Sequence, residues 1–230
     1  MKKVLLFFTL FLALSATVFA QNNCSKYYPM KEGATMEYTN YNKKGKIDGI
    51  THYKVKDVTT AGSTTKAILN LKISDKKGKE TYTTNYSLSC EGDLVKIDYK
   101  SLFPTQMMQQ YKNMEMDISG TDIELPNHLS VGQELTDANV AVNINISGMN
   151  LKVSVDQFNR KVVSQEKITT TAGTFNCIVL TQTTKSKTMG ANIELDSKLW
   201  LAEGIGIIKH ETYKKNGSIM SSSELTKHSK

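Results

Sequence analysis

The sequence predicts a mainly β protein, built as a single curved antiparallel sheet or as a partial barrel or sandwich of hairpins, with one short helix. From about Gly33 to the end, Thr, Val, Ile, Tyr and Lys alternate, and Gly-containing turns separate the alternating runs. Only one segment has apolar residues at helical spacing. At 230 residues, with 14 Gly and 3 Pro, the composition is typical of a folded chain rather than a disordered one.

The clearest predicted hairpin joins the alternating run 140–146 to the run 151–155. We assign Gly148 and Met149 to a two-residue turn, because a type II′ turn prefers Gly at its first central position. The predicted facing pairs are Ile146 with Leu151, Ile144 with Val153, and Val142 with Val155. Apolar side chains then share one face, and a slip of one residue would expose that whole face to water.

Three further turns share a pattern of polar or basic residues closed by Gly: Asn42–Gly45, Asp75–Gly78 and Lys214–Gly217. A type I turn followed by a left-handed Gly is the usual geometry for such loops. In the first and third turns, this geometry predicts that a Tyr lies opposite an Ile. The two pairs are Tyr41 with Ile47 and Tyr213 with Ile219.

The helical segment extends from Ser101 to Met114. Its apolar residues at helical spacing are Phe103, Met107, Tyr111 and Met114. Ser101 can cap the helix, and Pro104 is tolerated in the first turn. We therefore predict a short amphipathic helix here.

Methionines are concentrated around this helix, and three interpretations are open. In the first, a flexible thioether face packs the helix onto the sheet. In the second, the helix is a lid over the apolar concave side of the sheet and adapts to a lipid-like ligand. The candidate lid residues are Phe103, Met107, Met108, Tyr111 and Met114. In the third, the thioethers bind Cu(I), which favours soft sulfur ligands, although no His lies nearby.

Residues 1–20 have the pattern of a secretory signal peptide: Lys2 and Lys3 precede the apolar run 4–14, and small residues follow up to Ala20. We expect cleavage near Ala20 and export of a single β-rich domain, residues 21–230, to the periplasm or the cell exterior. The apolar run is too short for a bilayer span, and no other segment approaches that length. Lipidation of Cys24 is the less favoured alternative, because residues 21–23 are not small and apolar.

The three cysteines of the exported chain are expected to form one disulfide in an oxidising compartment. Three pairings are possible. We favour Cys24 with Cys90, because Cys177 lies within the apolar run 175–180 and is typical of a buried small hydrophobe.

The charge pattern argues against nucleic acid as a partner. The formal net charge is +7, and the 29 basic residues are all Lys except Arg160. Nucleic-acid sites usually use Arg, whose planar fork binds phosphate and guanine in pairs. We interpret the lysines, which are spread along the chain, as a solvated coat that keeps exposed strands from pairing with other chains.

The sequence contains no recognisable catalytic or metal-binding motif, so we predict a protein that is not an enzyme and needs no cofactor or metal. The four histidines are His52, His128, His210 and His228. None has the spacing of a zinc site, and we expect each to be exposed or fully hydrogen-bonded. There is no nucleophile elbow, phosphate-binding loop or dinucleotide fingerprint.

Four segments together carry a family resemblance: 28–33, 129–132, 171–177 and 200–209. Their order and spacing resemble the TapB-like family of exported bacterial proteins, which is related to a broader group of unknown function. The resemblance implies an antiparallel β fold of curved-sheet or partial-barrel type, with no catalytic residues to transfer. This chain has Thr171 where the usual pattern has Pro. Within the last segment, Gly204 and Gly206 favour a bend, and Trp200 is expected to anchor the core.

The function that these features favour is non-enzymatic binding of an apolar, lipid-like ligand, or of a partner chain, after export. The alternative is an interaction or scaffold protein of the envelope that has no small-molecule site. The sequence does not predict the oligomeric state.

Overall fold

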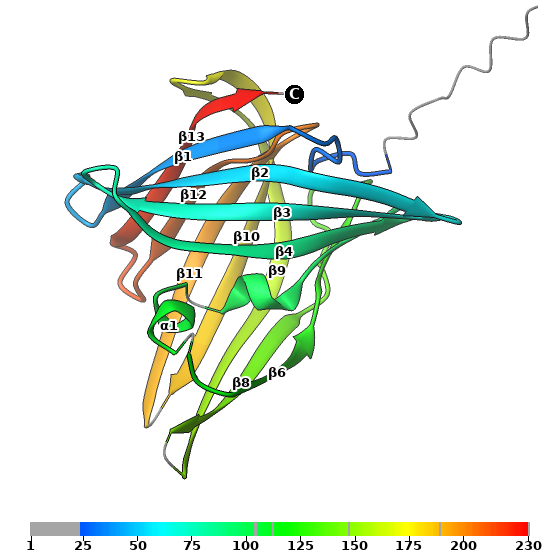
Figure 1. Ribbon diagram of the computed structural model, residues 1–230. Helices are drawn as coiled ribbons and strands as arrows, with labels where there is room; N and C mark the ends of the chain where they lie inside the picture. Colours follow the sequence, from blue (N-terminus) through cyan, green and yellow to red (C-terminus); the bar gives the residue numbers. More distant parts are fainter. Residues whose placement is uncertain (1–23, 104, 112, 147, 189, 230) are drawn as a thin grey trace, which may run out of the picture.

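Figure 1 shows the computed structural model, which describes residues 24–229 apart from positions 104, 112, 147 and 189. The predicted signal peptide and its cleavage near Ala20 lie outside the described residues. No helix in the described part of the chain is long and apolar enough to cross a membrane.

Strands dominate the structure, and the helical elements are short. The elements in chain order are β1 (Thr35–Asn42), β2 (Ile47–Ala61), β3 (Thr64–Asp75), β4 (Glu80–Glu91), β5 (Leu94–Ile97), the 3-10 helix η1 (Tyr99–Leu102), α1 (Thr105–Gln110), β6 (Met116–Thr121), β7 (Ile123–Pro126), β8 (Ala138–Ile146), β9 (Met149–Thr170), β10 (Gly173–Thr188), β11 (Ala191–Ala202), β12 (Gly206–Tyr213) and β13 (Ile219–Ser229).

The 13 strands form one antiparallel sheet that nearly closes into a barrel (Figure 1), which confirms the predicted fold class. The strand order is β6-β8-β9-β10-β11-β12-β13-β1-β2-β3-β4-β5-β7. Most neighbours are consecutive in the chain, as expected of a series of hairpins. The pairing of β1 with β13 joins the two ends of the described chain, and the short strands β6 and β7 form the edges of the sheet.

The Gly-closed turns have the predicted geometry. In the β1–β2 turn, the Gly45 N–H donates to the Asn42 carbonyl at 2.8 Å and Gly45 has a φ of 68°. The corresponding Gly78 and Gly217 also have positive φ. Tyr41 pairs with Ile47, and Tyr213 pairs with Ile219, as predicted.

The β8–β9 hairpin differs from the predicted register by two residues. The observed pairs are Ile146 with Met149, Ile144 with Leu151, and Val142 with Val153. Met149 therefore belongs to β9 and not to the turn, and Gly148 has a φ of 88°. A shift of two residues keeps every side chain on its predicted face, because side chains alternate with a period of two.

The predicted helix over 101–114 is too long. Ser101 lies inside η1 and does not cap α1, which has only six residues. Asp98 caps η1 instead, because its carboxylate accepts from the Lys100 N–H at 2.9 Å. Phe103 has extended backbone (φ −74°, ψ 130°), as expected of a residue before proline, and separates the two helical turns. Pro104 itself lies outside the described residues.

Buried side chains form two separate cores. The larger one, the barrel core, lies between the strands that wrap round from β9 to β5 and includes Val55, Leu69, Leu88, Val179 and Leu225. The smaller one, the flap core, lies where β6, β8 and the start of β9 extend beyond the barrel (Figure 1). Its buried residues are Phe103, Val140, Val142, Ile144, Leu151, Val153 and Val155.

Candidate functional site

A partly open cavity of about 290 Å³ lies in the barrel core. Most of its wall is apolar, with side chains that come from strands far apart in the sequence. These include Leu69, Leu88, Ile97, Leu125, Leu180 and Leu201. The volume is close to the lower end of the range for small-molecule pockets, about 300–1,000 Å³.

Four tyrosines line the cavity: Tyr28, Tyr38, Tyr53 and Tyr86. The rings of Tyr38 and Tyr53 meet edge to face with centroids 5.6 Å apart, and those of Tyr53 and Tyr86 do so at 6.1 Å. The Tyr38 hydroxyl donates to the Ile207 carbonyl at 2.9 Å. Burial raises the pKa of all four hydroxyls, so they stay protonated and give the wall an apolar body with polar tips.

A polar group of three side chains interrupts this wall: Gln157, Arg160 and His210. Gln157 is 9% exposed and Arg160 is 4% exposed. Within the described part of the chain, each has a buried atom without a hydrogen-bond partner: Gln157 Oε1, Arg160 Nε and His210 Nε2. Buried polar atoms are nearly always paired, so three unpaired atoms around one cavity point to a missing partner such as a ligand or water.

A β-bulge brings Gln157 and Arg160 to the same side of β9. Three residues apart, they would point to opposite faces of a regular strand. However, Thr183 pairs with Phe158 while Thr181 pairs with Lys161, so β9 contains one extra residue at this point. Asn159 accommodates it with a φ of 53°. Bulges commonly redirect a side chain in this way, and here the redirected residue is Arg160.

The Arg160 guanidinium is held by backbone carbonyls and not by a carboxylate. Its Nη1 donates to the Thr136 carbonyl at 2.5 Å and its Nη2 to the Glu124 carbonyl at 3.2 Å. Burial lowers its pKa, while the more distant charges of Asp137 and Glu124 partly offset that effect. The side chain stays charged, since even a lowered arginine pKa lies far above neutrality.

His210 is half-buried, and its ring lines the cavity from β12. Burial lowers its pKa to about 4, so the ring is neutral at neutral pH. The expectation that each His is exposed or fully hydrogen-bonded is wrong for this residue, because Nε2 has no partner among the described residues. His128, by contrast, is exposed and lies 2.7 Å from Asp93.

The segment η1 borders the cavity, where Ser101 and Leu102 contribute to the wall. It is attached to the sheet edge through Tyr99, whose N–H donates to Asp122 Oδ1 at 3.1 Å. The Tyr99 ring packs over Gly120 of β6, where any Cβ would collide with both the ring and the Asn139 carbonyl. A glycine at this position therefore lets η1 lie flat on the edge of the flap.

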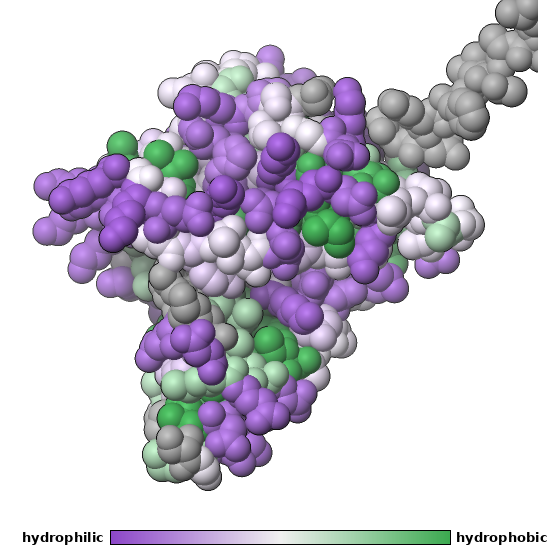
Figure 2. Space-filling model, in the orientation of Figure 1, coloured by the Kyte–Doolittle hydropathy of each residue, from purple (hydrophilic) through white to green (hydrophobic). Residues whose placement is uncertain are grey.

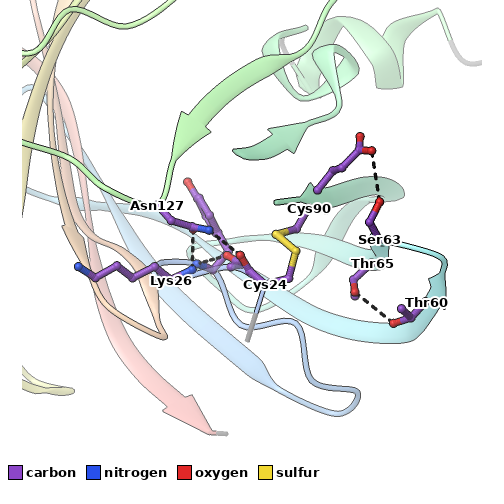
Figure 3. The surroundings of a disulfide bond; sticks show 10 residues. Cys24, Lys26, Thr60, Ser63, Thr65, Cys90 and Asn127 are labelled. Atoms are coloured by element: carbon purple, nitrogen blue, oxygen red, sulfur yellow. Dashed lines mark hydrogen bonds between the residues drawn. A yellow bond between two sulfur atoms is a disulfide. The ribbon is translucent and has the colours of Figure 1, made fainter. Parts of the chain in front are cut away.

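The first described residues form a strap beside the cavity, and Figure 3 shows how it is attached. A disulfide joins Cys24 to Cys90 of β4, which is the pairing favoured from the sequence. Asn127 clamps the strap from the other side: its Nδ2 donates to the Cys24 carbonyl at 2.6 Å, and its Oδ1 accepts from the Lys26 N–H at 2.7 Å. The strap thereby places the ring of Tyr28 in the cavity wall.

None of the five candidate lid residues lines the cavity. Phe103 is buried in the flap core, and Met107, Met108 and Tyr111 pack against that core while half-buried. Met114 is 38% exposed. The Met-rich segment thus covers the flap, while the cavity lies under the adjoining η1. Whether the segment opens as a lid stays a prediction, as does the Cu(I) alternative.

Trp200 lies outside the cavity wall, in the barrel core, as the sequence indicated. It is 4% exposed, and its indole N–H donates to Glu166 Oε2 at 2.7 Å. Lys198 Nζ lies 3.0 Å from Glu166 Oε1 and 4.7 Å from the centre of the indole ring. These hydrogen bonds lower the pKa of Glu166 to about 2, and the bond from the indole has the largest effect. Cys177 is buried and free, as expected.

Only a weak sequence signal marks the polar cavity residues, which belong to no recognised motif. Arg160 is the one Arg among 29 basic residues, and it lies in a strand with buried apolar neighbours. Its position facing the interior depends on the bulge at Asn159, which has no reliable sequence signature. Among the described residues, no group of three or more His, Cys, Asp or Glu side chains is placed to bind a metal ion.

Two solved structures are similar to this chain in fold. A predicted exported protein with a YmcC-like fold from Bacteroides fragilis is 22% identical, with a TM-score of 0.75 over 90% of this chain and 100% of that one. A predicted lipoprotein from Parabacteroides distasonis is 20% identical, with a TM-score of 0.75 over 89% of this chain and 99% of that one. At these identities the likeness establishes the fold alone.

Sequence comparison places the chain in a family. No curated protein matches it. The TapB-like resemblance is not among the matches found and stays a prediction, whereas the broader relationship to a group of unknown function is confirmed. The DUF3108-like family model matches residues 31–225, which is most of the chain and nearly all of the sheet, and this protein therefore belongs to the DUF3108-like family.

Proposed function

We propose that this protein is an exported, non-catalytic carrier that binds an apolar, lipid-like molecule in the cavity of its barrel. The observation that carries the proposal is the cavity itself: about 290 Å³, walled by leucine, isoleucine and tyrosine side chains. A cavity with an apolar wall and a few convergent polar groups is the usual form of a small-molecule site.

The surrounding surface is consistent with a soluble carrier. Figure 2 shows hydrophilic residues over most of the upper part of the visible face, with smaller hydrophobic groups there and further ones lower down, near β6 and β8. The fold neighbours described as an exported protein and a lipoprotein support export, together with the signal-peptide pattern of residues 1–20. Export would bring the chain to a compartment where the Cys24–Cys90 disulfide persists.

The first experiment looks for a bound molecule in protein purified from its native host. Native mass spectrometry and lipid extraction should recover an apolar molecule in about equimolar amount. The emptied protein should then enhance the fluorescence of phenylnaphthylamine, an apolar fluorophore, and added lipid should reverse that enhancement. A protein that carries no lipid and does not bind the fluorophore would contradict the proposal.

A pair of adjacent serines on β13 provides a matched control. Ser223 lines the cavity, whereas Ser222 does not. Ser223→Phe should fill part of the cavity and reduce fluorophore binding by tenfold or more, because the added ring occupies the space that the ligand needs. Ser222→Phe adds the same ring to the same strand and should leave binding unchanged.

The second candidate function is an envelope interaction protein without a small-molecule site. Exposed apolar side chains at hairpin ends favour it: Met149 is 71% exposed and Ile193 is 51% exposed. Co-purification from envelope extracts separates the candidates, since a scaffold should bring protein partners and a carrier should bring lipid.

A further inference from the structure

The cavity contains one cationic group, and that group is not neutralised where it is buried. Among the residues that line the cavity, only Arg160 carries a positive charge, since His210 is neutral at neutral pH. Among the described residues, the guanidinium forms no ion pair and its Nε has no hydrogen-bond partner. A buried charge is costly unless it is paired, so a ligand that supplies the opposite charge would be strongly favoured.

Building on the proposed function, we propose that the ligand is a single-chain amphiphile with a carboxylate head group. Its head group would lie against the Arg160 guanidinium and accept a hydrogen bond from Gln157 Nε2, and its chain would lie along the leucine and tyrosine wall. The Gln157 side chain has no hydrogen-bond partner among the described residues, so its Nε2 group can donate to the head group, while its unpaired Oε1 can only accept, for example from water.

A monoanion fits this site better than a phosphate. Arg160 already donates one N–H from Nη1 and one from Nη2 to backbone carbonyls, so two of its five N–H donors are used within the protein. A phosphate has more charge and three acceptor oxygens, and its usual sites supply several cationic or backbone donors. The carboxylates of Glu124 and Asp137 interact with the guanidinium through their charge, without a hydrogen bond. Their negative charges would repel a dianion more strongly than a monoanion.

The size of the cavity favours one chain over two. A volume of about 290 Å³ is at the small end for ligand pockets, which would suit a single acyl chain better than a diacyl lipid. The edge-to-face tyrosines give the wall a smooth, largely apolar surface along β1, β2 and β4. The polar side chains on β9 and β12 then determine the orientation of the ligand, with the head group beside them and the acyl chain along the apolar wall.

The test compares three probes with the same chain on the intact protein: dodecanoate, dodecanol and dodecyl phosphate. Each is titrated at pH 7.5 against bound phenylnaphthylamine, below its micelle concentration. Dodecanoate should bind at least about tenfold more tightly than dodecanol, because a hydrogen bond to a charged group is worth this much in a buried site. It should also bind more tightly than dodecyl phosphate.

Variants assign the preference to the named residues. Arg160→Gln should remove the preference for dodecanoate and leave dodecanol binding unchanged. Because Arg160 also ties two loop carbonyls, Gln157→Leu serves as a second variant that breaks no hydrogen bond of the protein; it should weaken dodecanoate several-fold and spare dodecanol. Lys161→Gln removes an exposed neighbouring charge and should change neither.

The outcomes distinguish the two proposals. Equal binding of dodecanoate and dodecanol, or tighter binding of dodecyl phosphate, overturns the carboxylate site and leaves the carrier function standing. A preference for dodecanoate that survives in both variants also overturns it. If no probe displaces the fluorophore, both proposals fail.

Discussion

The barrel core and the flap core are built from the same alternating strands but differ in what fills them. In the flap core, seven buried apolar side chains pack under the Met-rich segment. In the barrel core, a similar apolar face borders a partly open cavity, beside which three buried polar atoms have no partner among the described residues. Alternation therefore determines which face of a strand is buried, whereas closure of the sheet determines whether that face is fully packed or borders a cavity.

The largest expected effect is on packing in the flap. Ile144→Ala should lower the free energy of unfolding by about 3–5 kcal/mol, because Ile144 is fully buried and its loss leaves a cavity. Leu199→Ala should cost only about 1–2 kcal/mol, because Leu199 is half-buried and already borders empty space. Denaturant unfolding measures both.

Fluorophore binding completes that comparison. It should stay intact in Ile144→Ala and stay equal or rise in Leu199→Ala, whose cavity is larger. Equal losses of stability in the two variants would show that the barrel interior is packed as tightly as the flap, and the distinction between the regions would fall.

Much of this fold could be predicted because its main signals are local in the sequence, and the same locality limits what could be predicted. Alternation and turn chemistry are local, so the pairs Tyr41–Ile47 and Tyr213–Ile219 could be predicted correctly. The β8–β9 register was wrong by two residues because that error leaves the pattern of buried faces unchanged. The cavity could not be predicted from local information, because its wall brings together residues far apart in the sequence, such as Tyr28 and Ser223.

The candidate site shows the same limit. The methionines are the compositional outlier, and among the interpretations open from the sequence were packing onto the sheet and a lid over a ligand; in the structure Met107 and Met108 pack against the flap core. Arg160 enters the cavity only through a bulge at Asn159. A one-residue insertion in the pairing of two strands reverses which residues face inward, and such insertions arise from long-range pairing rather than from local sequence.

The next effect concerns the covering segment. In the double variant Met107→Ser with Tyr111→Ser, the free energy of unfolding should fall by about 2–4 kcal/mol, because both side chains pack against the flap core while half-buried. Fluorophore binding should change little, since neither residue lines the cavity. A fall in ligand retention with an unchanged melting temperature would instead establish the segment as a lid.

A smaller effect, specific to the barrel, is expected on acidification. Burial lowers the pKa of His210 to about 4 from its ordinary value of 6.5. Between these values the unfolded chain takes up a proton that the folded one does not, so stability is full above pH 6.5 and falls as the pH drops to 4. We expect a loss of roughly 1–3 kcal/mol from this residue.

Chemical denaturation at several pH values measures this loss, with His210→Gln as the comparison. The variant should show a flatter profile between pH 6.5 and 4. Glu166 and Glu211, whose pKa values are lowered by their hydrogen bonds, act mainly below pH 4.5 and do not obscure that window. Identical profiles for the wild type and the variant would indicate that the His210 ring is reached by water from the cavity.

The smallest effect isolates the bulge that distinguishes the barrel segment of β9 from its flap segment. Asn159 is exposed and has a φ of 53°, so its substitution acts through the backbone alone. Asn159→Val should cost about 1–2 kcal/mol, since a β-branched residue strains this left-handed conformation, whereas Asn159→Gly should be nearly neutral. If Val is tolerated as well as Gly, the strand can relax its bulge, and Arg160 would then turn away from the cavity. Dodecanoate titration of the Val variant detects that rotation directly, because the preference over dodecanol depends on Arg160 facing Gln157.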